Sequence, residues 1–148
     1  QNVINWVENT FIQKRHFMKG LQWGIFYNKF KDVSFNPQEI EEAITEIIKF
    51  EDKIKPKGIY EFILTGEPKY LSARKFPDNI KTRVYEMQDR KCKVCKETFD
   101  ISEMEADHKK PWFDNGETTV ENCQMLCRPD HYDKTAEQTK TLRARLKV

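Results

Sequence analysis

The chain has no long apolar run and no strong excess of charge of either sign. Its 148 residues contain no stretch near the length that a membrane-spanning helix needs, and the opening residues lack the pattern of a secretory leader. The 26 basic residues nearly balance the 24 acidic ones, and a net charge of +2 argues neither for nor against a nucleic-acid partner. Repeats and low-complexity segments are also absent. This length suits one domain, or one small domain with an attached helical piece.

Cysteine is scarce as well, with four residues in the chain. Without a leader, we expect a cytoplasmic protein whose cysteines are thiols or metal ligands rather than a disulfide framework. Because Gln1 rather than Met opens the sequence, we also expect a piece of a longer protein.

The first 75 residues are predicted to be mainly helical. Asn36 is a good N-cap and Pro37 suits the first helical position. An apolar stripe at helical spacing follows and is expected to form core: Ile40, Ala43, Ile44, Ile47 and Ile48. The stretch GIYEFILTG, 58–66, is compatible with either a short helix ending at Gly66 or a strand.

After Arg90 short segments alternate with turn signals. The stretches 104–112 and 119–127 read as extended, and DNG at 114–116 is a hairpin-turn signal because Asn and Gly tolerate positive φ. The stretch 129–147 reads as a closing helix. We therefore predict an α+β fold, with a helical region over 1–75 and a small domain of a knuckle, two strands and a helix over 76–148.

Cysteine spacing in this second region indicates a metal site. Cys92 and Cys95 stand two residues apart, so that one tight turn can direct both thiolates at the same ion, and Cys127 and Asp130 repeat the spacing. A redox pair would need a βαβ context, which is missing. Zinc accepts carboxylate oxygen, so Asp130 is a reasonable fourth ligand; His131 and Cys123 are its rivals.

Between the two halves of the knuckle lies the sequence ADHKKP. Asp107 and His108 are adjacent on a predicted strand, and adjacent strand residues point to opposite faces, so the two groups are expected to serve different partners. A carboxylate can hold a hard cation while a neutral imidazole acts as a base. A purely structural zinc ribbon has no need of such a pair.

Taken together, CKVC, ADHKKPW, DNGETT, ENCQMLC and DHYDKT resemble an HNH nuclease of the zinc-knuckle branch of the ββα-metal endonucleases. The resemblance covers about 76–140. It implies that His108 is the general base and that Asn122 fixes the chain around it by backbone hydrogen bonds. It further implies that His131 and Asp107 hold the catalytic metal. Asp130 stands where the family usually has a fourth cysteine.

The function implied is hydrolysis of DNA phosphodiesters with a catalytic Mg²⁺, or Mn²⁺ or Ni²⁺, and a structural Zn²⁺. Candidate phosphate contacts are Lys109, Lys110, Arg128 and Lys134. The alternative is a non-catalytic, zinc-stabilised module that binds DNA or protein. A decayed nuclease would be expected to lose His108 or a metal carboxylate first, and both are present.

The stretch GIYEFILTGEPKYLSARKF, 58–76, also resembles the segment before the HNH domain in bacterial proteins that join a ParB-like domain to a nuclease. Such proteins are associated with restriction and phage defence. The resemblance implies that the helical region is a fragment of, or a linker to, a further N-terminal domain.

Overall fold

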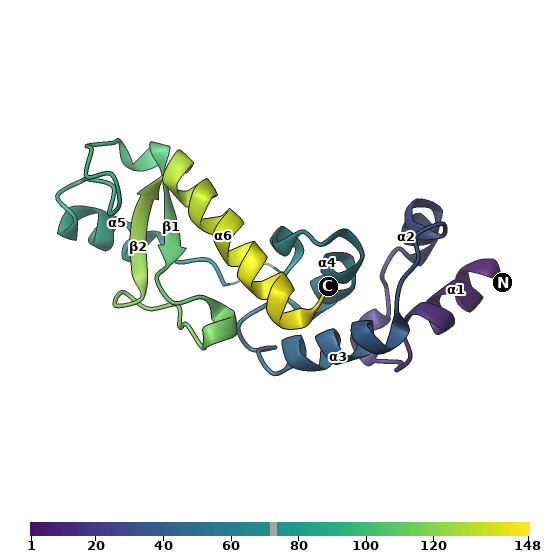
Figure 1. Cartoon of the computed structure of the whole chain (residues 1–148). Coiled ribbons are helices and arrows are strands. Elements are labelled where there is room, and N and C mark those ends of the chain that lie inside the picture. The colour runs from purple at the N-terminus through teal and green to yellow at the C-terminus, as the bar shows by residue number, and fades with distance from the viewer. Residues whose placement is uncertain (72–73) are drawn as a thin grey trace. The chain divides into compact units, whose positions relative to one another are not determined.

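A computed structural model describes residues 1–71 and 74–148, and its main elements are labelled in Figure 1. The chain divides into two compact units, one of Gln1–Ser72 with Arg143–Val148 and one of Ala73–Leu142. Helices and one two-stranded antiparallel sheet make up the regular structure of the described residues, which confirms the α+β class. Over the ranges described, no helix is long and apolar enough to cross a membrane.

The first unit is helical, as predicted. Its helices are α1 (Asn2–Thr10), α2 (Trp23–Phe30), α3 (Pro37–Ile48) and α4 (Ile59–Thr65). Helix α3 begins where the sequence places it, because the Asn36 carboxamide oxygen accepts hydrogen bonds from the backbone of Gln38 (3.0 Å) and Glu39 (3.2 Å). The apolar stripe of α3 is buried at Ile40, Ala43, Ile44 and Ile47.

The stretch 58–66 forms a helix rather than a strand. Helix α4 ends at Gly66, whose φ of +74° lies in the left-handed region, and the Gly66 N–H bonds to the Phe62 carbonyl at 2.7 Å. Five of the seven residues of α4 are buried, so its apolar run reflects a helix covered on several faces. Periodicity alone does not separate such a helix from a buried strand.

The second unit carries the region that the sequence singled out. Its elements are α5 (Asp78–Met87), β1 (Met104–His108), β2 (Cys123–Cys127) and α6 (Arg128–Leu146), whose last residues group with the first unit. The two strands run antiparallel (Figure 1), with Asp107 opposite Gln124 and His108 opposite Cys123. Their core includes Phe76, Val84, Tyr85, Met104, Cys123, Met125 and Leu126.

Strand β2 has a second partner on its outer side, the side chain of Gln88. The Gln88 carboxamide accepts a bond from the Met125 N–H (2.9 Å) and donates one to the Met125 carbonyl (3.0 Å). The Lys93 N–H donates to the same carbonyl at 3.1 Å. A side chain and a loop thus satisfy backbone groups that a third strand would otherwise satisfy.

The DNG segment does not make the tight hairpin that its sequence suggests. The strands are joined by the longer connection 109–122, which contains the 3₁₀ turn Trp112–Asp114. Asn115 ends that turn with a φ of +64°. Gly116 has no positive φ; a side chain there would overlap the Lys110 carbonyl oxygen, so it is the close approach of backbone that requires glycine.

Candidate metal centres and catalytic residues

Three thiols and one carboxylate converge in the second unit. Their possible ligand atoms, from Cys92, Cys95, Cys127 and Asp130, all lie within 4.8 Å of one another. Asp130 Oδ2 is 3.2 Å from Cys92 Sγ and 3.1 Å from Cys127 Sγ. Around a tetrahedral zinc ion, two sulfurs lie about 3.8 Å apart and an oxygen about 3.5 Å from a sulfur. We call these four residues the thiol cluster, and their donor set fits zinc.

Local backbone geometry brings the four side chains together. The Cys92 N–H bonds to the Glu97 carbonyl (2.9 Å) and the Lys96 N–H bonds back to the Cys92 carbonyl (3.0 Å). Lys96 holds a φ of +67°, which closes the turn. Cys127 ends β2 and Asp130 lies in the first turn of α6, so the strand-to-helix junction supplies the other two ligands.

The thiol cluster holds protons on its sulfur atoms that a metal ion can replace. Burial opposes ionisation of Cys92, but backbone N–H groups of Cys127, Cys95 and Val94 are directed at its sulfur, and its pKa lies below the ordinary thiol value. Burial raises the pKa of Cys127 to about 12. Hydrogen bonds from the thiols of Cys127 and Cys92 lower the pKa of Asp130. An ion that replaces these shared protons satisfies all four groups at once.

Neither rival fourth ligand belongs to the thiol cluster. Cys123 is buried in the core of the second unit, and burial raises the pKa of its thiol to about 11. His131 instead faces Asp107: its Nε2 lies 3.9 Å from Asp107 Oδ1. Asp130 and His131 are adjacent in the first turn of α6, where successive side chains diverge by about 100°.

Asp107 and His131 form the start of a second centre. The Asp107 side chain is 7% exposed and is a buried charge. Its Oδ2 accepts a hydrogen bond from Gln124 Nε2 (2.9 Å) and forms a close ion pair with the Lys134 ammonium. Its Oδ1 faces His131. We call Asp107, His108 and His131 the Asp107 centre.

His108 lies beside Asp107 but has different surroundings, as expected for adjacent residues of a strand. Its ring packs on Phe76, with centroids 4.2 Å apart, and its Nε2 lies 3.0 Å from Thr118 Oγ1. Burial lowers the pKa of His108 below its ordinary value; the Asp107 charge opposes this shift and the Lys134 charge adds to it. The imidazole is therefore neutral near pH 7 and able to accept a proton.

The Asn122 side chain hydrogen-bonds to two other parts of the connection between β1 and β2. Its carboxamide donates to the carbonyls of Lys110 (3.0 Å) and Glu117 (2.8 Å) and accepts from the Lys110 N–H (2.8 Å). The Asn122 carbonyl also accepts a bond from the Lys109 N–H at 2.8 Å. These bonds hold the backbone on both sides of the turn that follows His108.

The four candidate phosphate contacts differ in their surroundings. Lys109 and Lys110 are exposed on the connection that follows His108. Arg128 donates to the Ser102 carbonyl (2.6 Å) and lies 3.7 Å from Glu105. Lys134 is engaged with Asp107 and with the His108 carbonyl. Lys109, Lys110 and Arg128 are thus exposed to solvent, Arg128 with partners within the chain as well, whereas Lys134 is largely enclosed.

Several residues around these centres had no signal in the sequence. Gln124, Thr118 and Phe76 contact Asp107 or His108 through pairings that depend on strand register and on the path of a long connection. Gln124 would have been identified only by knowing that it lies opposite Asp107 in the sheet.

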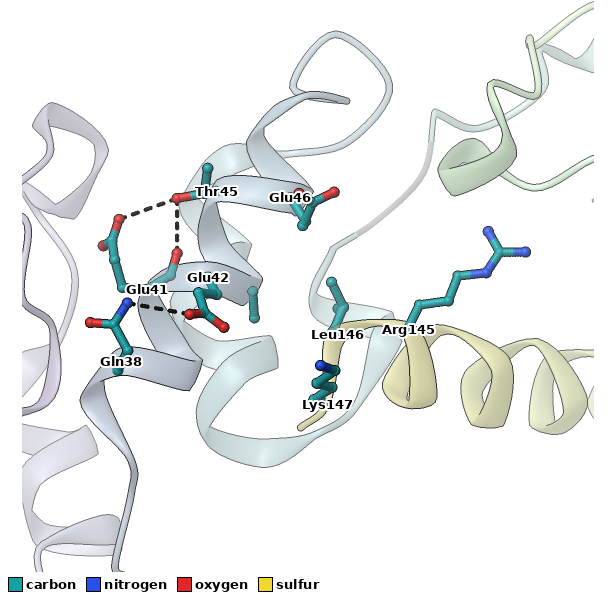
Figure 2. A pocket seen from close by; sticks show the side chains of 9 residues that line it. Gln38, Glu41, Glu42, Thr45, Glu46, Arg145, Leu146 and Lys147 are labelled. Carbon is teal, nitrogen blue, oxygen red and sulfur yellow. Dashed lines mark hydrogen bonds between the residues drawn. The ribbon is translucent and has the colours of Figure 1, made fainter.

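A hollow of about 520 Å³ lies elsewhere, in the first unit, and shares no residue with either centre. It is lined by α3 side chains and by Arg145, Leu146 and Lys147 (Figure 2). Its polar groups bond along α3: Thr45 donates to Glu41, and Gln38 donates to Glu42 at 3.3 Å. Four of the lining residues are thus engaged in hydrogen bonds with neighbours on α3: Gln38, Glu41, Glu42 and Thr45.

Comparison with known proteins agrees with the geometry. Residues 92–137 match the family model for HNH endonuclease, a span that holds the thiol cluster, both strands and the start of α6. Searches of curated proteins and of solved structures found no match. Residues 92–137 are therefore similar to HNH endonucleases and contain a cysteine cluster consistent with a zinc knuckle, which confirms the HNH resemblance in this region.

Proposed function

We propose that this HNH domain is a DNA endonuclease that hydrolyses phosphodiester bonds with the help of a divalent cation. The observation that supports it most is the arrangement of the Asp107 centre. A buried carboxylate and an imidazole, Asp107 and His131, face each other at 3.9 Å, with a second imidazole next to them in the chain. A structural zinc ribbon has no use for these groups.

Asp107 and His131 fit the role of cation ligands. The 3.9 Å between Asp107 Oδ1 and His131 Nε2 is less than twice a metal–ligand distance of about 2.1 Å, so these two atoms could hold one ion between them. Mg²⁺ keeps several of its waters and needs few protein ligands, whereas the imidazole also admits Mn²⁺ or Ni²⁺. When bound, the cation would neutralise charge that develops on the phosphate and the leaving 3′-oxygen.

His108 is the proposed general base. Its lowered pKa keeps the ring neutral near pH 7, so it can take a proton from the water that attacks phosphorus. Thr118 and Phe76 hold the ring, and the bonds of Asn122 hold the backbone on either side of the following turn. Lys109 and Lys110, exposed on the same connection, are the proposed phosphate contacts.

The thiol cluster is proposed to hold one structural zinc ion, with Asp130 as the fourth ligand. The origin of its ligands supports this role, because an ion there would join the turn at 92–95 to the end of β2 and the start of α6 in a small unit.

The wider role proposed is restriction or phage defence in a bacterial cytoplasm. It rests on the resemblance of 58–76 to the segment that precedes the nuclease in ParB-like/HNH proteins. Positions 72 and 73 of that stretch lie outside the described residues.

The test is cleavage of supercoiled plasmid by the purified chain with Mg²⁺, Mn²⁺ or Ni²⁺. We expect nicking that EDTA abolishes and that added cation restores. His108→Ala should lower the rate by about 10²–10⁴-fold while leaving fold and DNA binding nearly unchanged. His16→Ala, an exposed histidine of the first unit, is the matched control and should cleave normally.

A wild-type rate in His108→Ala would rule out this assignment of the base. DNA or protein binding with no cleavage under any of the three cations would favour the alternative, a zinc-stabilised binding module.

A further inference from the structure

Lys134 lies where a phosphate contact would be hard to make. It follows His131 by three residues on α6, and its side chain is 26% exposed. Its ammonium group forms a close ion pair with Asp107 Oδ2 and donates to the His108 carbonyl oxygen at 2.7 Å. One group therefore holds the side chain of the proposed metal ligand and the backbone of the proposed base.

The contacts of Asp107 separate its two oxygens. Oδ2 accepts from both Lys134 and Gln124, whereas Oδ1 faces His131 Nε2 at 3.9 Å. With Oδ2 held by two donors, Oδ1 is the oxygen left to coordinate a cation. The carboxylate is thereby restricted to binding through one oxygen.

We propose that Lys134 is a positioning residue of the Asp107 centre rather than a phosphate contact, an inference that rests on the proposed function. Its two bonds fix Asp107 and His108 relative to each other and reserve Oδ1 for the cation. Its positive charge also opposes cation binding. The chain thus binds its cation more weakly than Asp107 and His131 would bind it without Lys134 beside them. In return, the positions of Asp107 and His108 are fixed.

Loss of the ammonium group then has two opposite effects. Removing a positive charge close to the cation, and freeing Oδ2 to bind it, tightens cation binding by on the order of tenfold. Losing the two bonds loosens Asp107 and the His108 backbone and slows turnover by about 10–100-fold, the usual effect of removing a partner of a metal ligand. A phosphate contact has neither signature.

The experiment compares Lys134→Met, Lys134→Arg and the wild-type chain. Lys140→Met is the matched control, since Lys140 lies on the same helix in an exposed pair with Glu137. Mn²⁺ affinity is measured without DNA by electron paramagnetic resonance. kcat and KM are measured at saturating Mn²⁺, and the salt dependence of DNA binding is measured with Ca²⁺ in place of Mn²⁺.

We expect Lys134→Met to bind Mn²⁺ more tightly and to have a lower kcat, with KM and salt dependence unchanged. Lys134→Arg keeps the charge, so its Mn²⁺ affinity should stay near that of wild type while kcat falls; this variant carries the test if Lys134→Met fails to fold. The inference is overturned if Lys134→Met keeps wild-type Mn²⁺ affinity and kcat. It is also overturned if that variant raises KM and lowers the salt slope by about 1, the effect of a lost phosphate contact. If the wild-type chain itself neither binds Mn²⁺ nor cleaves, the proposed function has failed.

Discussion

Asp130 and His131 are neighbours in the chain that face different groups. The Asp130 carboxylate bonds with the thiols of Cys92 and Cys127, whereas the His131 imidazole faces Asp107. Their place in the first turn of a helix produces this division, because adjacent helical side chains point in different directions. The two proposed ions can then take separate ligands from one short segment.

Substitution of Asp130 should affect only the proposed zinc ion, and substitution of His131 only the proposed catalytic cation. We expect Asp130→Ala to lose zinc and to lower the melting temperature by about 10 °C, since the ion contributes to folding. Asp130→Cys should bind zinc more tightly and raise that temperature. His131→Ala should keep zinc and stability and lose cation-dependent cleavage. Metal analysis and thermal melts of the purified variants measure these effects.

The exposed residue Asp133, on the same helix, gives the control: Asp133→Ala should change neither property. The proposed division of ligands is wrong if His131→Ala loses zinc and fold together while Asp130→Ala is neutral.

At the residue scale, local spacing was informative and long-range contact was not. Within each half of the thiol cluster a single turn sets the spacing, so the sequence alone pairs Cys92 with Cys95 and Cys127 with Asp130, while it leaves His131 and Cys123 as rival fourth ligands. The contacts of Lys134 and Gln124 with Asp107 depend on how α6 and β2 pack against β1. No local pattern encodes that packing, so the sequence alone does not predict these two contacts.

At the element scale, β2 depends on a side chain for part of its backbone bonding. Gln88 pairs with both the N–H and the carbonyl of Met125, and Met125 is fully buried. A glutamine carboxamide matches a peptide group in its donor and acceptor, which allows it to act as one more strand residue.

Gln88→Leu should therefore destabilise the second unit by about 1–3 kcal/mol, because it leaves the buried Met125 N–H unpaired while the Met125 carbonyl keeps its bond from Lys93. Gln88→Glu keeps the acceptor for the Met125 N–H and loses only the donor, so its effect should be smaller. Urea unfolding followed by circular dichroism measures both. Equal stability of Gln88→Leu and wild type would show that water accepts the hydrogen bond of the Met125 N–H in place of the side chain.

Element types were predictable where capping and periodicity agreed, as in α3, and less so elsewhere. The signal at 114–116 predicts a tight hairpin turn, and this prediction is wrong, because the left-handed conformation of Asn115 closes a 3₁₀ turn within a longer connection. Gly116 is needed for backbone contact, and such a contact has no signature in local sequence.

At the scale of the whole molecule, two units with separate cores should respond differently to metal removal. A zinc chelator should lower the melting temperature of the second unit by about 10 °C or more, and Cys92→Ser or Cys127→Ser should act in the same way. Trp6 and Trp23 lie in the first unit and Trp112 in the second. In a Trp112→Phe variant, tryptophan fluorescence reports the first unit, and its melt should not shift with chelator. A folded second unit that contains no zinc would contradict the structural role of the ion.

The first unit should have its own dependence on pH. Arg15 and Glu41 form a two-point ion pair, with Nη1–Oε1 at 2.9 Å and Nη2–Oε2 at 2.5 Å. The hydrogen bond from Arg15 lowers the pKa of Glu41 below 4.5. A depressed carboxyl pKa contributes stability that is present above the unfolded pKa of 4.5 and is lost as pH falls through the folded value.

Glu41→Gln should thus destabilise the first unit by about 1–2 kcal/mol at pH 7 and flatten its loss of stability below pH 4.5. Glu46→Gln, which breaks an exposed pair with Lys49, should have almost no effect. Denaturant melts from pH 3 to pH 7 measure this. If Glu41→Gln loses stability below pH 4.5 as steeply as wild type does, other titrating groups cause that loss.

The thiol cluster is open to solvent at one of its members. Cys95 is exposed, whereas Cys92, Cys127 and the core residue Cys123 are buried. Oxidants and alkylating reagents therefore reach the cluster through Cys95, and a single modified sulfur there removes one of the proposed zinc ligands. Among the cysteines of the cluster, direct access of thiol reagents is thus limited to one sulfur atom.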